Sequence, residues 1–139
     1  MADRLATEEL CAGDVMSRRF LSAAPEDTLG ELAEKLAEAD TGSALVVEYG
    51  QLIGILTSRD VVRSVAGRVH PSEARVRHWM STTLITAAPE LPADEAARLM
   101  LNGGFHHLPV TEDDRPVGVV GLRAVSGALH QRIAGVVIQ

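Results

Sequence analysis

Apolar positions alternate with polar turn residues along the chain, and the first clear pattern predicts a strand followed by a helix. Residues 20–23 form a short apolar stretch typical of a strand. Apolar residues within 29–37 then recur at the i, i+3, i+4 spacing of an amphipathic helix. Thr28 and Glu31 have the spacing of a capping box, which predicts that this helix begins directly after Thr28. The helix is predicted to end around Asp40-Thr41-Gly42, where Gly42 can act as a C-terminal stop.

Two unbroken apolar runs follow and predict buried strands. They lie at 44–47 and 52–56, and Tyr49-Gly50 between them predicts a tight hairpin. A second helix is predicted to begin near Ser58, because Thr and Ser are helix N-cap types. The predicted order is therefore strand, helix, strand, strand, helix.

The same order recurs with an offset of 64, since Met16-Ser17 returns as Met80-Ser81. No gap is needed to align 14–66 with the later copy, so we interpret the chain as an internal duplication. The aligned pairs include Pro25 with Pro89, Val46 with Val110, Glu48 with Glu112, Gly54 with Gly118, Arg59 with Arg123 and Val61 with Val125. We predict an α+β fold with repeats at 10–66 and 78–134, packed about a pseudo-twofold axis. In the linker, 67–77, Pro71 is predicted to start a short helix.

Composition and charge favour a globular protein that neither binds nucleic acid nor spans a membrane. The 139 residues carry a net charge of −6 and are 46% hydrophobic, which favours a globular protein over a disordered one and argues against a nucleic-acid surface. No apolar run reaches the roughly 20 residues that span a bilayer, and the N-terminus does not resemble a signal peptide. The lone Cys11 excludes an intrachain disulfide and is consistent with a cytoplasmic location.

The segment from Gly54 to Asp60 is the strongest candidate for binding chemistry. It predicts a buried strand that runs directly into a helix, with Thr57 and Ser58 at the helix start and Asp60 in its first turn. Free N–H groups at such a junction suit a phosphate, and a carboxylate can accept hydrogen bonds from both hydroxyls of a ribose. The alternative is structural: Thr57 or Ser58 caps the helix, and Asp60 complements its dipole.

Taken in order, these segments resemble a tandem pair of CBS domains, the Bateman module. The resemblance covers about residues 10 to 130, and the sequence Gly-Ile-Leu-Thr-Ser-Arg-Asp matches the family's nucleotide signature. Its other supports are Asp14-Val15-Met16, the Ala-Pro-Glu before each first helix, Gly42-Ser43-Ala44-Leu45-Val46-Val47 and Phe105-His106-His107-Leu108-Pro109-Val110.

The resemblance implies an adenosine-containing ligand, chiefly AMP, ADP or ATP and less often S-adenosylmethionine or NAD, in a cleft between the copies; no cofactor is required. Asp60 would hold the ribose hydroxyls, Thr57 a phosphate or ribose oxygen, and Ile55 the adenine. Arg59 is placed to neutralise phosphate. The opposite wall would comprise Ala88, Ala93, Phe105 and His106.

The second copy departs from the signature. Gly121 and Ala124 stand where the first copy has Thr57 and Asp60, although Arg123 remains. The other wall of this second cleft would be Ala24, Leu29, Thr41 and Gly42. We therefore predict one competent site per chain and a second that is weak or empty.

Other candidate chemistry is weaker. His106 and His107 would point to opposite faces of a strand, which disfavours a shared metal, and no further ligand spacing is evident. No nucleophile motif surrounds Ser58, Ser126 or Cys11, and no Walker-type loop is present, so we do not expect an enzyme.

The predicted function is a regulatory adenine-nucleotide-binding module that couples ligand sensing to dimer geometry or to an unidentified effector protein. The alternative is a structural dimerisation or interaction module without a physiological nucleotide. A homodimer is expected in either case, because modules of this family usually pair through their helices. The apolar tail, 133–139, could add a strand to a sheet, cover the dimer interface or pack on its own core.

Overall fold

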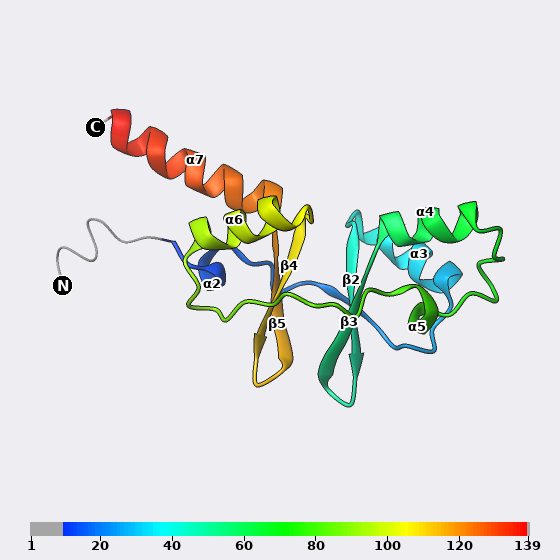
Figure 1. Cartoon of the computed structure of the whole chain (residues 1–139). Coiled ribbons are helices and arrows are strands. Elements are labelled where there is room, and N and C mark those ends of the chain that lie inside the picture. The colour runs from blue at the N-terminus through cyan, green and yellow to red at the C-terminus, as the bar shows by residue number, and fades with distance from the viewer. Residues whose placement is uncertain (1–9, 139) are drawn as a thin grey trace. The chain divides into compact units, whose positions relative to one another are not determined.

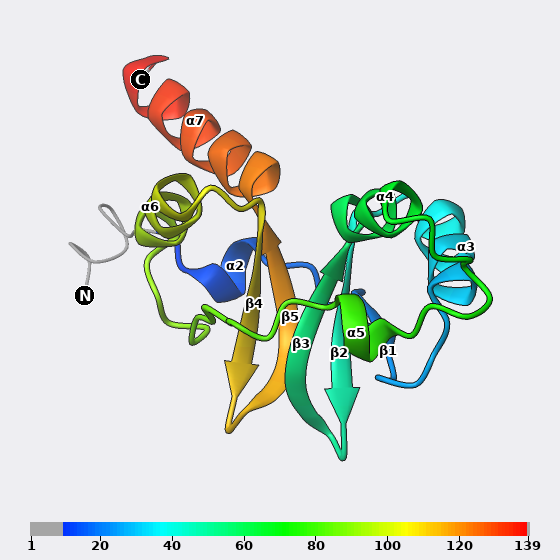
Figure 2. The ribbon, with the colours of Figure 1, turned by 45° about the vertical axis from the view of Figure 1, so that its right-hand side comes forward.

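The computed structural model describes residues 10–138, with side chains through residue 130, and the chain divides into two compact units. Unit A comprises Arg19–Leu84 with Asp113–Pro116, and unit B comprises the chain up to Arg18, Ile85–Glu112 and the chain from Val117 onward. Figure 1 labels the elements of the two units apart from β1, which is labelled in Figure 2. No described helix is both long enough and apolar enough to cross a membrane.

Unit A contains the strands and helices predicted for the first copy. A three-stranded sheet has the order β1-β2-β3, with β1 parallel to β2 and β2 antiparallel to β3. Figure 2 shows α3 and α4 side by side. The bounds are β1 (Leu21–Ala23), α3 (Leu29–Ala39), β2 (Ser43–Glu48), β3 (Gln51–Thr57), α4 (Ser58–Ala66) and α5 (Val76–Trp79).

The predicted capping box starts α3. The Glu31 N–H donates to Thr28 Oγ1 at 3.1 Å, and the Thr28 N–H donates to Glu31 Oε1 at 3.4 Å. The helix ends in the predicted region, since its last residue is Ala39 and its C-cap is Asp40. The residue that takes the left-handed conformation is Asp40, with φ of 51°, and not Gly42; aspartate tolerates this conformation.

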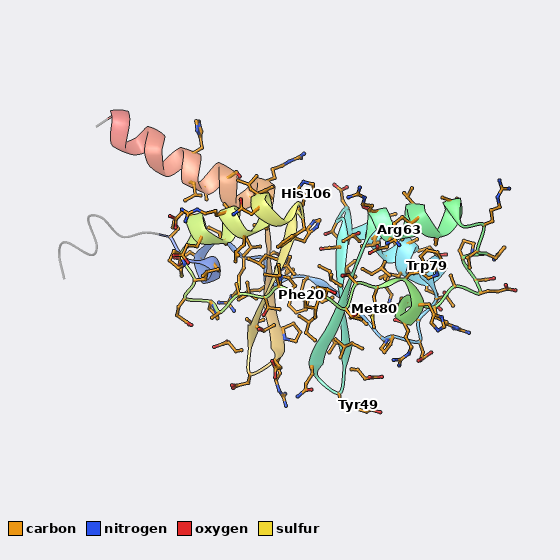
Figure 3. All side chains as sticks on the ribbon, viewed as in Figure 1. Phe20, Tyr49, Arg63, Trp79, Met80 and His106 are labelled. Atoms are coloured by element: carbon orange, nitrogen blue, oxygen red, sulfur yellow. The ribbon has the colours of Figure 1, made fainter. Side chains whose placement is uncertain are left out.

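Two tight hairpins join the paired strands. Tyr49 and Gly50 both have positive φ, 55° and 78°, as do Asp113 and Asp114 at the aligned positions, with 51° and 64°. Two consecutive left-handed residues are typical of the type I′ turn that matches strand twist. The predicted hairpin at Tyr49-Gly50 is therefore confirmed, and the second repeat has the same turn. Tyr49 stands at the tip of its hairpin with 95% of its surface exposed (Figure 3).

Unit B follows the second copy, with one difference: the first strand is reduced to a single bridge between Ala87 and Val110. Ala87 donates to the Pro109 carbonyl and accepts from the Thr111 N–H, both at 2.9 Å. Extending this parallel ladder toward Ile85 would require the N–H that proline lacks, whereas the first copy has Leu45 at the aligned position. The named elements are α2 (Ala12–Val15), α6 (Ala93–Gly103), β4 (His107–Glu112), β5 (Arg115–Gly121) and α7 (Leu122–Ile138).

The segment that opens each repeat packs in the unit built on the other repeat, which the sequence did not predict. In unit B, Ser17 pairs with Val119 of β5, with N–H to O distances of 2.8 and 3.0 Å. In unit A, Ser81 pairs with Ile55 of β3 in the same way, at 2.9 and 3.0 Å. In each unit, the hairpin of one repeat therefore pairs along its outer strand with the opening segment of the other repeat.

The hydrophobic cores show the same exchange. Ala12 of α2 is fully buried among the core residues of α6, β4 and β5, and Val76 of α5 is fully buried in the core beneath α3. The short helix expected at Pro71 is instead α5, which begins at Val76, because residues 71–73 form a turn. The tail does not form a strand, since α7 continues to Ile138; its side chains lie outside the described residues.

Candidate functional site

The junction between β3 and α4 in unit A holds a nearly buried carboxylate. The side chain of Asp60 is 12% exposed, and its Oδ2 accepts from the Thr57 N–H at 2.9 Å and from the Thr57 hydroxyl at 3.2 Å. Because Thr57 is the N-cap of α4, these bonds satisfy a donor that the helix start would otherwise leave unpaired. The structural role that the sequence suggested for this pair is confirmed, and the ribose-binding role stays a prediction.

Arg63 is a partner of Asp60 that sequence reasoning missed. Its Nη1 donates to Asp60 Oδ1 at 3.1 Å, and the Arg63 side chain is 64% exposed on α4 (Figure 3). The i, i+3 spacing of opposite charges on a helix could have indicated this ion pair. The carboxylate is therefore engaged on both oxygens, by Thr57 on one and by Arg63 on the other.

The remaining predicted residues of this junction, Ile55 and Arg59, lie in β3 and in the first turn of α4. Ile55 is partly exposed in β3, where its backbone pairs with Ser81, and Arg59 is exposed in the first turn of α4. The structure thus brings Ile55, Thr57, Arg59 and Asp60 together at the end of one strand and the start of one helix.

The other four predicted contacts lie in unit B and differ in their surroundings. Ala88 and His106 are exposed, whereas Phe105 is partly buried. Ala93, the first residue of α6, is fully buried, and its N–H donates to the Leu10 carbonyl at 2.7 Å. Each unit therefore carries its own share of the predicted site residues, and their joint role stays a prediction.

His106 shares a cavity with the second copy of the signature. The cavity has a volume of about 530 Å³ and lies where β4 begins and where β5 passes into α7. The Leu122 N–H donates to the His106 carbonyl at 2.8 Å, which fixes this corner of the backbone. The residues that line it are His106, His107, Gly121, Leu122 and Arg123.

We expect His107 to make the stability of the protein depend on pH. Burial lowers the pKa of this half-buried imidazole, and the charge of His106 lowers the pKa further. The unfolded chain, with a histidine pKa of about 6.5, then binds the proton more readily than the folded chain. We expect the free energy of unfolding to fall as the pH drops below about 6.5, and to lack this dependence above it.

Denaturant titrations of wild type and His107→Ser at about pH 7.5 and about pH 5.5 measure this effect. Serine is the residue at the aligned position 43 of the first copy. The variant should lose less stability between the two pH values than wild type. An equal loss in both proteins would assign the dependence to other groups.

A second cavity, also of about 530 Å³, lies in unit A between α3 and α4. Its wall is largely apolar and includes Leu36, Val61 and Val62, and neither Thr57 nor Asp60 lines it. It is therefore separate from the predicted ribose contacts. Within residues 10–138, no group of three or more His, Cys, Asp and Glu side chains is arranged to hold a metal ion.

Comparison with known sequences identifies the repeats. The family model of the CBS domain matches residues 12–67 and again residues 76–131. The CBS domain-containing protein YhcV of Bacillus subtilis is 29% identical over 109 residues, which are 78% of this chain and 78% of that protein. An uncharacterized protein of Methanopyrus kandleri is 33% identical over 81% of this chain, which spans 59% of that protein. An L-aspartate semialdehyde sulfurtransferase of Methanosarcina acetivorans is 31% identical, and this chain spans 24% of its length.

Solved structures show the same architecture. The CBS domain pair of protein MJ0100, in complex with 5′-methylthioadenosine and S-adenosyl-L-methionine, superimposes with a TM-score of 0.82 at 25% identity, covering 89% of this chain and 98% of that one. The CBS-domain protein ATU1752 of Agrobacterium tumefaciens gives a TM-score of 0.78 at 27% identity, covering 85% and 98%. The fold is therefore that of a CBS domain pair.

Proposed function

The chain belongs to the CBS-domain family, with two copies of the domain in tandem, and from this premise we propose that it is a non-catalytic regulatory module that binds an adenosine-containing ligand. The ligand class we favour is the adenine nucleotides AMP, ADP and ATP. The MJ0100 domain pair, which carries methylthioadenosine and S-adenosylmethionine, supports the adenosine part of this proposal. Binding would shift the population of module conformations that a partner protein recognises.

One observation carries the proposal: the fold builds the same strand–helix junction twice but places Thr57 and Asp60 at only one. The Ser58 N–H donates to the Gly42 carbonyl at 3.0 Å, and the aligned Leu122 N–H donates to the His106 carbonyl at 2.8 Å. The second junction forms without a carboxylate or hydroxyl at its helix start. The polar pair of the first junction is therefore not required to make the fold, which favours a binding role for it.

We assign the sugar of the ligand to Thr57 and Asp60, with Ile55 along the base and Arg59 near the phosphate. A carboxylate offers acceptors to both ribose hydroxyls, and a guanidinium pairs with phosphate oxygens in bidentate fashion. Ala88, Ala93, Phe105 and His106 remain predicted ligand contacts on the strength of the family resemblance. The second junction, with Gly121 and Ala124, is proposed to bind nucleotide weakly or not at all.

A thermal-shift screen tests the ligand class directly. AMP, ADP, ATP, NAD, S-adenosylmethionine and methylthioadenosine are compared with GMP as a purine control. At a hundredfold excess over Kd, binding stabilises the folded protein by about 2.7 kcal/mol, which corresponds to roughly 5–10 °C in Tm for a chain of this size. The proposal fails if no adenosine compound raises Tm more than GMP does.

A purely structural dimerisation module is the second candidate function, and the lost polar pair at Gly121 and Ala124 favours it. Both candidates include a homodimer. Val62 and Val65 of α4 are 66% and 60% exposed, so this helix presents apolar side chains that a monomer would leave in water. We propose that this face of α4 contributes to the contact between two copies of the chain.

Sedimentation analysis of wild type and Val65→Glu tests the dimer. Wild type should sediment as a dimer. The variant should dissociate into monomers at a higher protein concentration than wild type, because the new charge would be buried in an apolar contact. Arg68→Glu, an exposed change just beyond the end of α4, serves as the control and should remain dimeric. A monomeric wild type would contradict this part of the proposal.

A further inference from the structure

Asp60 has little room for new hydrogen bonds. A carboxylate offers about four lone-pair positions, two on each oxygen. Oδ2 already accepts from the Thr57 N–H at 2.9 Å and the Thr57 hydroxyl at 3.2 Å, which accounts for both of its positions. Oδ1 accepts from Arg63 Nη1 at 3.1 Å, which leaves one position. A sugar diol brings two donors, so one existing partner must leave.

The partners of Asp60 differ in how easily they can be displaced. The Thr57 N–H belongs to the backbone at the start of α4 and cannot move without opening the helix turn. The Thr57 hydroxyl donates to the same oxygen and is held by the same residue. The Arg63 side chain is long, flexible and 64% exposed. Its guanidinium donates to Oδ1, the oxygen that still has one free acceptor position. Arg63 is therefore the partner that a diol would replace.

We infer that Arg63 is an internal competitor of the sugar diol at Asp60, and that it sets the affinity and the hydroxyl selectivity of the site. This inference rests on the proposed function, because it concerns the same carboxylate. In the free protein the guanidinium occupies Oδ1. A ligand with two adjacent hydroxyls must displace it, whereas a ligand with one hydroxyl uses the vacant position on Oδ1 and leaves the ion pair intact.

The ion pair also has a function in the free protein. It offsets the charge of a carboxylate whose side chain is only 12% exposed, and a charge at that depth is destabilising unless it is paired. An exposed arginine forms a weak pair with such a carboxylate, worth at most a few-fold in an equilibrium constant. Arg63 is thus a positioning residue that can be exchanged for ligand, and it does not contribute to the core of unit A.

Arg63→Met removes the competing donor and keeps a long side chain with good helix propensity. By isothermal calorimetry, we expect this variant to bind adenosine about two- to fivefold more tightly than wild type. The affinity for 2′-deoxyadenosine should be unchanged. Arg63→Lys, which retains the charge, should remain close to wild type. The gain with adenosine should shrink at high salt, because salt screens the ion pair in the wild type.

Arg98→Met is the matched control. Arg98 is also an exposed helical arginine, 66% exposed, with an acidic partner on its own helix, Asp94 at 3.8 Å. This variant has the same charge change and should bind both nucleosides as wild type does.

Two results would overturn the inference while leaving the proposed function intact: an unchanged adenosine affinity in Arg63→Met, or an equal gain for adenosine and 2′-deoxyadenosine. Failure of wild type and Arg63→Met alike to bind adenosine would also overturn the inference, and failure of wild type to bind AMP as well would overturn the proposed function.

Discussion

Replacing Asp60 with asparagine should weaken AMP binding about ten- to a hundredfold while the protein stays folded. Hydrogen bonds to a charged acceptor are worth about 1.5–3 kcal/mol, and asparagine retains only one acceptor oxygen for the ribose hydroxyls. That oxygen can still accept from the Thr57 N–H, which Asp60 now holds at 2.9 Å, so the start of α4 is preserved. Calorimetric titration with AMP gives the affinity, and thermal unfolding without ligand gives the stability.

Asp14→Asn is the matched control for this change. In α2 of unit B, Asp14 Oδ2 accepts from the Cys11 N–H at 2.9 Å and from Cys11 Sγ at 3.2 Å, as Asp60 Oδ2 accepts from the N–H and hydroxyl of Thr57. Both variants should stay folded, but only Asp60→Asn should lose affinity. Equal AMP affinity in Asp60→Asn and wild type would remove the ribose-binding role from Asp60.

Gly118→Ala should destabilise the protein by about 1–3 kcal/mol, because the fold leaves no space for a methyl group there. A Cβ on Gly118 would lie 2.4 Å from Met16 Sδ and 3.0 Å from the Ser17 carbonyl oxygen. The thioether can move, but the backbone of Ser17 is paired with Val119 on the same strand. Thermal unfolding should show Tm lowered by roughly 3–10 °C.

Gly121→Ala separates this packing effect from the general effect of replacing a glycine in β5. A Cβ on Gly121 would have no heavy atom within 4 Å, and its backbone φ lies outside the left-handed region. This variant should unfold close to wild type. Adding Met16→Ala to Gly118→Ala should cost less than the sum of the two single changes, because the smaller side chain vacates the space. Additive losses would show that Met16 and Gly118 do not compete for one volume.

Local chemistry predicted much of the fold. The capping box at Thr28 and the turn at Tyr49-Gly50 depend on residues close in sequence, so the pattern sufficed for both. Pro109 also indicates a short first strand in the second repeat, because its missing N–H prevents the parallel pairing at Ala87 from extending further. The exchange of opening segments could not be predicted, because periodicity identifies an apolar face without identifying the sheet that covers it.

In the candidate site too, contacts between residues close in sequence were easier to predict than contacts between distant ones. Side-chain types and spacing were enough to predict Thr57 at a helix start and Asp60 in its first turn, and the structure confirms both placements. The hydrogen bonds between the two residues were not predicted. Arg63 was missed because the nucleotide signature ends at Asp60, although the spacing of three residues between opposite charges predicts an ion pair on a helix. The position of His106 beside Gly121 and Arg123 depends on the pairing of β4 with β5, which the signature alone does not describe.

We propose that the junction with Thr57 and Asp60 binds an adenine nucleotide and that its counterpart with Gly121 and Ala124 does not. Isothermal calorimetry of the wild-type protein with AMP measures this directly, because it gives the number of sites together with the affinity. We predict a stoichiometry of one AMP per chain, lost or strongly weakened in Asp60→Asn. Two equal sites per chain, or no heat of binding above the GMP control, would contradict the account.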